Sequence, residues 1–319
     1  MFLDTFVCTS ESSIPDLNDL QLECVVSLEA AYNDMVLESC QLKYQAMVEG
    51  VSIIHEGVIE SIKNFFKAIF RAIKKFFGGS SSGGGGGSSR NVATLKKMSK
   101  DERVRKGLEY LFNHPELLDK HKIPDVETLV NIKSTELKKG LKEAMEFATN
   151  AVTSIANNPD SKVALDGDQI ALETLRFFIR NTFVNYIPIM SAKIDSLDDF
   201  KKALFDHTKL VIPSDLGLDA HGGYEAMLDD MDKEEQNLQK QKAIVTKQLE
   251  EFEKNVISNV PKEYAGIACK VAKNLTNACM IYFAYGCKVT NQLFQETRQI
   301  FDMALKIDTK QSYLYLNHL

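Results

Sequence analysis

The sequence predicts an all-α fold, and three observations support this prediction. Apolar residues recur at the three- and four-residue spacing of a helix face in nearly every segment. Residues that start helices, chiefly Ser, Asp and Glu, precede several of these segments. Strand signals are nearly missing, because the best candidate, residues 209–213 (KLVIP), is short and ends in proline.

Three regions divide the chain. Residues 1–77 are expected to form a helical arm, residues 78–89 (GGSSSGGGGGSS) a flexible linker, and residues 90–319 a helical domain. Glycine and serine supply no apolar surface and leave the backbone wide freedom, which is typical of a tether. A linker of this composition is also common in engineered proteins, so its natural origin is left open.

Charge divides the arm into two parts. Residues 1–60 contain eleven Asp and Glu but only one base, Lys43, whereas residues 61–77 contain five bases and no acid. The acidic part predicts a helix over residues 19–49, and one face of it carries Cys24, Leu28, Tyr32, Met35, Leu42 and Ala46. Two helices bury too little surface for a core of their own. The arm is therefore expected to fold back as a hairpin, to dock on the larger domain, or to stay partly mobile.

Residues 58–77 predict a basic amphipathic helix, which is the clearest functional signal in the sequence. Its apolar face consists of Ile62, Phe65, Phe66, Ile69, Phe70, Ile73, Phe76 and Phe77. Its other side carries Lys63, Lys67, Arg71, Lys74 and Lys75. Such a helix suits an anionic membrane surface or an acidic groove on a protein.

An apolar stripe of this kind also commonly faces a protein core. Here that core would include the acidic helix of residues 19–49, whose charge is opposite. Both interpretations remain open at this point. They are compatible if the acidic segment covers the basic helix until it is released.

The helical domain is expected to begin with shorter helices and to end with a long hairpin. A first helix is expected to start with the capping residues 99–102 and to run through Phe112, and others are expected over residues 134–156 and 168–186, followed by a short one that Ser196 caps. The hairpin spans about residues 223–307. Its first helix places Tyr224, Met231, Leu238, Val245 and Phe252 seven residues apart, as in a coiled-coil seam.

Two further patterns complete the hairpin. A second seam of Leu228, Leu249 and Val256 is interrupted by Glu235 and Lys242. The last helix, which starts near Pro261, carries small residues suited to close packing: Ala265, Ala268, Cys269, Ala272, Ala278, Gly286 and Ala304.

No motif in the chain predicts an enzyme, a metal site or a cofactor site. The six cysteines form no CxxC pair, and their spacing matches no zinc module, so they are expected to be reduced structural thiols. The six histidines show no paired spacing on a helix. An enzyme would need groups such as His207 and His221 to converge with carboxylates in one pocket.

Composition also argues against several locations and partners. The N-terminus lacks the basic start and apolar core of a secretory signal. The longest apolar run, Ala278–Cys287, is about half the ~20 residues that span a bilayer. The net charge is −6, so diffuse nucleic-acid binding by the whole protein, which needs a broad basic surface, is not expected. No specific nucleic acid is expected as a partner.

The acidic helix followed by IIHEGVIESIKNFFKAIFRAIKKFF resembles virion structural proteins of large tailed bacteriophages. The resemblance covers residues 20–77 and lies in the pattern of acidic arm and Lys/Phe/Ile helix. It implies a protein made in the host cytoplasm and packaged in the virion. It also implies a possible processing site after Glu56, before Gly57, because Ile54-His55-Glu56 resembles sites that prohead proteases of the T-even type cut.

The sequence thus predicts a non-enzymatic phage structural protein with an amphipathic helix for a membrane surface or a partner. Other virion proteins, self-association through the hairpin and an anionic membrane surface are the expected contacts. Two alternatives remain: a helical scaffold or adaptor whose basic helix is docked on protein, and a membrane-active effector.

Overall fold

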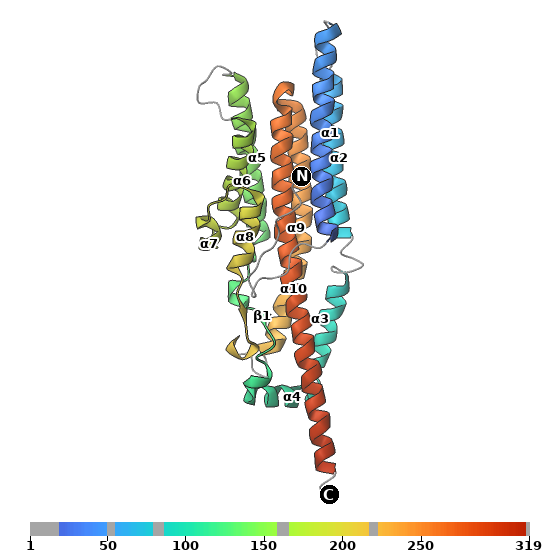
Figure 1. Cartoon of the computed structure of the whole chain (residues 1–319), viewed down its shortest axis with the longest axis vertical. Coiled ribbons are helices and arrows are strands. Elements are labelled where there is room, and N and C mark those ends of the chain that lie inside the picture. Colours follow the sequence, from blue (N-terminus) through green and yellow to red (C-terminus); the bar gives the residue numbers. More distant parts are fainter. Residues whose placement is uncertain (1–18, 50–54, 79–85, 158–165, 217–222, 317–319) are drawn as a thin grey trace.

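The computed structural model describes residues 19–49, 55–78, 86–157, 166–216 and 223–316. These residues form an elongated all-α protein (Figure 1), which confirms the predicted fold class. The ten α-helices are α1 (Asp19–Glu49), α2 (His55–Gly78), α3 (Gly86–Met98), α4 (Glu102–Asn113), α5 (Ser134–Asn157), α6 (Gly167–Thr182), α7 (Ile187–Ser191), α8 (Leu197–His207), α9 (Gly223–Asn259) and α10 (Ala265–Leu316).

Short elements connect these helices. Four 3-10 turns lie at Pro115–Leu117, Val126–Thr128, Pro213–Leu216 and Lys262–Tyr264. Strands β1 (Ile123–Pro124) and β2 (Leu210–Val211) pair antiparallel, with Ile123 opposite Val211. Residues 209–213 were not expected to form a strand. They do contain one, β2, but it pairs over two residues only.

The axis of the molecule is α10, which contacts α1, α2, α3, α4, α5, α6, α8 and α9. In Figure 1 it runs along most of the protein, with α1 and α2 on one side and α5 and α6 on the other. Residues 275–286 of α10 are buried throughout, as expected for a central helix. The hairpin of α9 and α10 confirms the predicted pair of long C-terminal helices.

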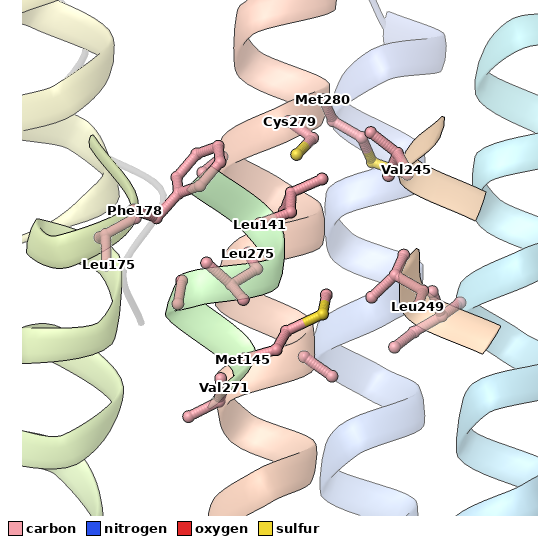
Figure 2. Packing of buried hydrophobic residues seen from close by; sticks show 14 of the residues in the cluster. Leu141, Met145, Leu175, Phe178, Val245, Leu249, Val271, Leu275, Cys279 and Met280 are labelled. Atoms are coloured by element: carbon pink, nitrogen blue, oxygen red, sulfur yellow. The ribbon is translucent and has the colours of Figure 1, made fainter. Parts of the chain in front are cut away.

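Two hydrophobic cores lie along this hairpin. The first core joins α1, α2, α5, α6 and α8 to the C-terminal half of α9 and the N-terminal half of α10. Figure 2 shows part of it, where Leu141 and Met145 of α5 and Leu175 and Phe178 of α6 approach Leu275 and Cys279 of α10. The second core joins α3 and α4 to the start of α9 and to α10 from Leu293 to Ala304.

The predicted heptad seam of α9 is buried, but it serves both cores. Tyr224 and Met231 belong to the second core, and Leu238, Val245 and Phe252 belong to the first. Because α9 also contacts α5, α3 and α2, the hairpin is not an isolated two-stranded coiled coil. The small residues listed for α10 are buried, and one of them, Ala304, lies against Gly107 of α4. At Gly107 of α4, a Cβ atom would lie 2.0 Å from the carbonyl oxygen of Ala304.

Side chains fix several helix starts. Asp101, which lies within the predicted start at residues 99–102, caps α4 by accepting a hydrogen bond from the Arg103 amide. Asp166 and Gln169 form a reciprocal capping box at α6. Ser196 caps α8 as predicted, by accepting a hydrogen bond from the Asp199 amide.

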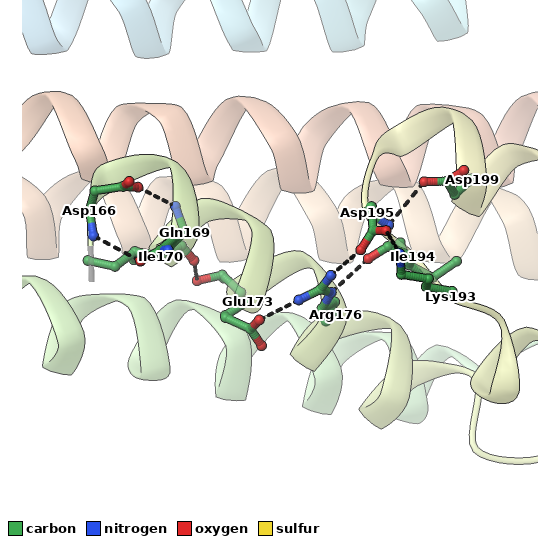
Figure 3. A network of polar contacts seen from close by, with 10 residues as sticks. Asp166, Gln169, Ile170, Glu173, Arg176, Lys193, Ile194, Asp195 and Asp199 are labelled. Atoms are coloured by element: carbon green, nitrogen blue, oxygen red, sulfur yellow. Dashed lines mark hydrogen bonds and ion pairs between the residues drawn. The ribbon is translucent and has the colours of Figure 1, made fainter. Parts of the chain in front are cut away.

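Arg176 ties α6 to the loop before α8 (Figure 3). Its Nε donates to the Ile194 carbonyl at 2.7 Å, and its guanidinium also pairs with Glu173 and Asp195. Helix α6 ends at Thr182, four residues before the expected end at Tyr186. Near the predicted linker, α3 takes in residues 86–89, while residues 79–85 lie outside the described part.

Candidate functional site: the basic helix and the junction of the two cores

Helix α2 carries the whole predicted interaction surface, and its two faces have opposite environments. Its apolar side is at most 3% exposed at Ile62, Phe65, Phe66, Ile69, Ile73 and Phe76. Phe70 and Phe77 are partly buried against the same core. The basic side is exposed at Lys63, Lys67, Arg71, Lys74 and Lys75. The apolar face is therefore used within the chain, and the basic face lies at the surface.

Aromatic rings join α2 to three other helices. Phe65 meets Tyr32 of α1 with ring centroids 6.0 Å apart. Phe66 meets Phe252 of α9 at 6.4 Å, and Phe77 meets Phe283 of α10 at 4.9 Å. All three pairs are edge-to-face, the geometry that the ring quadrupoles favour. The α1–α2 hairpin is thus built into the first core, which is the docked form among the arrangements expected for the arm.

A buried lysine fastens α1 to α10. The side chain of Lys273 is 8% exposed, and its Nζ lies 2.6 Å from the Glu29 carboxylate. The same Nζ lies 4.5 Å from the centre of the Tyr32 ring, so a cation–π contact adds to the ion pair. Burial raises the pKa of Tyr32 to about 12, and nearby negative groups act in the same direction. The negative charge of Glu29 on the acidic helix is therefore balanced by Lys273 of α10.

The basic side of α2 includes an ion pair with an acid of the same helix. Lys67 lies 3.5 Å from Glu60, but both side chains are more than half exposed. Such a pair contributes at most about 1 kcal/mol to stability. Glu253 of α9 lies close enough for Lys63 and Lys67 to oppose the rise that burial causes in its pKa. The bases of α2 therefore remain a positively charged surface.

The other predicted positions give no reactive site among the described residues. Glu56 and Gly57 lie in the first turn of α2, so cleavage between them requires this turn to unwind. His207 ends α8 beside the Tyr186 ring, whereas His221 lies outside the described residues. Across the described ranges, no cluster of three or more His, Cys, Asp or Glu is arranged to hold a metal.

The cysteines in the described part of the chain form no disulfide. Cys24, Cys269 and Cys279 are buried, Cys40 is exposed and Cys287 is half-buried. Burial raises the pKa of Cys269 to about 12, so this thiol stays protonated and unreactive near neutral pH. Cys8 lies outside the described residues.

A second site, which the sequence reading missed, lies where the two cores meet. There the extended segment of residues 129–133 is held by tyrosine hydroxyls. The Val130 amide donates to the Tyr285 hydroxyl at 3.1 Å, and the Ile132 amide donates to the Tyr282 hydroxyl at 3.2 Å. The Tyr186 hydroxyl donates to the carbonyl of Asn131 at 2.6 Å.

Helix α9 completes this polar network. Asn237 and Gln241 both donate to the Ile132 carbonyl, at 3.1 and 2.5 Å. Asn237 lies between Met231 and Leu238 of the heptad seam, and Gln241 lies between Leu238 and Val245. The signal was present in the sequence as the interruption of the heptad pattern at Glu235 and Lys242. Nothing in the sequence indicated that residues 129–133 would cover it.

Glu234 is the unusual group in this stretch. Burial raises the pKa of its carboxyl to about 7, while a hydrogen bond from Asn131 opposes the shift. Its Oε2 atom is buried and has no hydrogen-bond partner in the structure. A carboxyl group that is half-ionised near neutral pH is thus placed at the junction of the cores.

Glu234 should make the protein less stable as the pH rises. Its folded pKa of about 7 lies above the ordinary value of 4.5, so the folded state binds more protons between these values. The free energy of unfolding then falls from about pH 4.5 to about pH 7. We expect Glu234→Gln to remove this fall and to stabilise the protein at pH 8 by about 2 kcal/mol. Urea unfolding of both proteins from pH 4 to 8 measures the difference.

The control for this prediction is Glu250→Gln, which neutralises an exposed carboxylate on the same helix. This variant should retain the fall in stability between about pH 4.5 and pH 7 that Glu234 causes. Parallel profiles for Glu234→Gln and the unchanged protein would contradict the assignment of Glu234 as a buried titrating group.

None of the described helices combines the length and the low charge that crossing a bilayer requires. Neither models of protein families, nor curated proteins, nor solved structures match this chain. Its function therefore has to be inferred from the two features described above, the docked basic helix and the polar junction around Glu234.

Proposed function

We propose that this protein is a non-enzymatic structural protein of a phage particle, in which α2 is docked on its own bundle and presents its basic side to an acidic partner protein. The observation that carries the proposal is the burial of the apolar side of α2 beside an exposed row of bases. A helix that has already buried its Phe and Ile side chains has little apolar surface left for lipid. This favours the scaffold or adaptor role over permanent membrane insertion.

Charge supports the same role. The exposed bases Lys63, Lys67, Arg71 and Lys74 belong to one helix, in a chain whose net charge is −6. A local basic row of this kind raises the association rate with an acidic surface and selects against basic partners. The virion as location rests on the resemblance of residues 20–77 to phage structural proteins. Mass spectrometry of purified particles tests it, and their lack of this chain would contradict it.

The docked helix makes a clear prediction for vesicle binding. The chain contains no tryptophan, so Phe70→Trp places a single fluorescent reporter on α2. We expect brominated lipids in anionic vesicles to leave the emission of the full-length variant unchanged, because the first core holds the apolar side of α2. A synthetic peptide of residues 57–77 should become helical on the same vesicles.

The matched peptide carries Asp in place of Phe65, Phe66 and Phe70, and it should stay unfolded and unbound. Quenching of the full-length reporter by brominated lipid would contradict the docked-helix proposal. It would favour the membrane-binding interpretation instead.

A further inference from the structure

A cavity of about 560 Å³ lies where the two cores meet. Val130, Tyr285 and Val289 line it from the first core, and Met227, Met231 and Leu293 line it from the second. Its volume falls within the range of about 300–1,000 Å³ that is usual for small-molecule sites. The walls are mainly apolar. Two of the lining residues, Met227 and Met231, have flexible side chains that adapt to the shape of a ligand.

Two carboxylates also line the cavity, and they differ in their partners. Asp230 is exposed and pairs with Lys233 at 2.8 Å. Glu234 also lines the cavity and is half-buried. Lys233 lies in the same lining and pairs with Asp230, so Glu234 is the acidic group that this base does not balance.

We propose that this cavity binds a small amphiphilic amine, with its apolar body against the methionine and valine side chains and its ammonium group on the Glu234 carboxylate. The charges select this ligand class. With Asp230 and Glu234 against Lys233, the lining carries a net charge of about −1, which opposes an anionic ligand and favours an ammonium group that donates to a carboxylate. A purely apolar ligand would fill the walls but leave the Glu234 carboxylate without a counter-ion.

Because the cavity lies between the two cores, a bound ligand should stabilise the whole protein. Its lining comes from both cores and from the segment that the three tyrosines hold. A ligand that binds only the folded protein raises its stability by mass action. Binding should therefore be visible as a rise in the melting temperature of the full chain.

The test uses n-hexylamine as probe and n-hexanol, of the same chain length, as its neutral match. Calorimetric titration of the full-length protein at pH 7.5 should give an affinity for the amine at least about tenfold above that for the alcohol, as a charge-assisted hydrogen bond implies. Glu234→Gln should remove this preference and leave the affinity for the alcohol unchanged. Glu250→Gln, on the exposed side of α9, should preserve it.

A second pair of variants tests the place of binding without disturbing the cores. Ala226 is exposed and lines the cavity, so Ala226→Trp should block the amine. Ala243 is exposed on the same helix away from the cavity lining, so Ala243→Trp should bind it normally. Equal affinities for amine and alcohol, or an amine affinity that survives both Glu234→Gln and Ala226→Trp, would overturn the proposal.

Discussion

Replacing Phe66 with alanine is expected to lower the free energy of unfolding by about 3–5 kcal/mol, the usual cost of emptying a buried aromatic site. The side chain of Phe66 is fully buried and contacts the rings of Phe65, Phe70 and Phe252. Its loss leaves a cavity between α2 and α9 at the centre of the docked hairpin. Urea unfolding followed by far-ultraviolet circular dichroism measures the loss.

Lys67 follows Phe66 directly but points to solvent, so Lys67→Ala is the matched control. It should change the stability by no more than about 0.5 kcal/mol. Similar small effects for both variants would mean that α2 is not docked on the bundle in solution. The function proposed above would then lose the observation on which it depends.

Replacing Gly107 with alanine is expected to cost about 3 kcal/mol or more, the upper part of the range for overpacked sites. The new methyl group would lie 2.0 Å from the carbonyl oxygen of Ala304, and a backbone atom cannot rotate away. Helices α4 and α10 must therefore separate, which loosens the second core. Thermal unfolding and hydrogen exchange of the α4 amides measure the effect.

Gly266 provides the opposite case within the same protein. It lies in the first turn of α10, and a Cβ atom there would meet nothing within 4 Å. Gly266→Ala should therefore stabilise the protein by up to about 1 kcal/mol through helix propensity. If Gly107→Ala were as well tolerated as Gly266→Ala, the close crossing of α4 and α10 would be wrong.

Local patterns predicted most of the helices because a helix with one buried face requires apolar residues three and four positions apart. The acidic helix was expected over residues 19–49, and α1 has these bounds. The heptad residues of α9 were expected to be buried and are buried. Helix α3 was missed in part because glycine and serine, which have low helix propensity, form its first turn.

Long-range contacts were beyond the reach of such patterns. The hydrogen bonds of Val130 and Ile132 join residues 155 and 150 positions away in the chain. Likewise, the stripe on α2 indicated that its Phe and Ile side chains would be buried, but it could not name Tyr32, Phe252 and Phe283 as their partners. The burial of the Glu234 carboxyl depends on segments that lie far apart in the sequence, so no single stretch of sequence predicts it.

The length of α10 has a mechanical consequence. Its 52 residues form one uninterrupted helix, roughly 78 Å long at about 1.5 Å per residue. The same rigid rod passes through both cores, so their spacing and their rotation about its axis are set together. A load applied near the C-terminal end of α10 is carried along the rod to the buried Lys273 and the helix pair that it fastens.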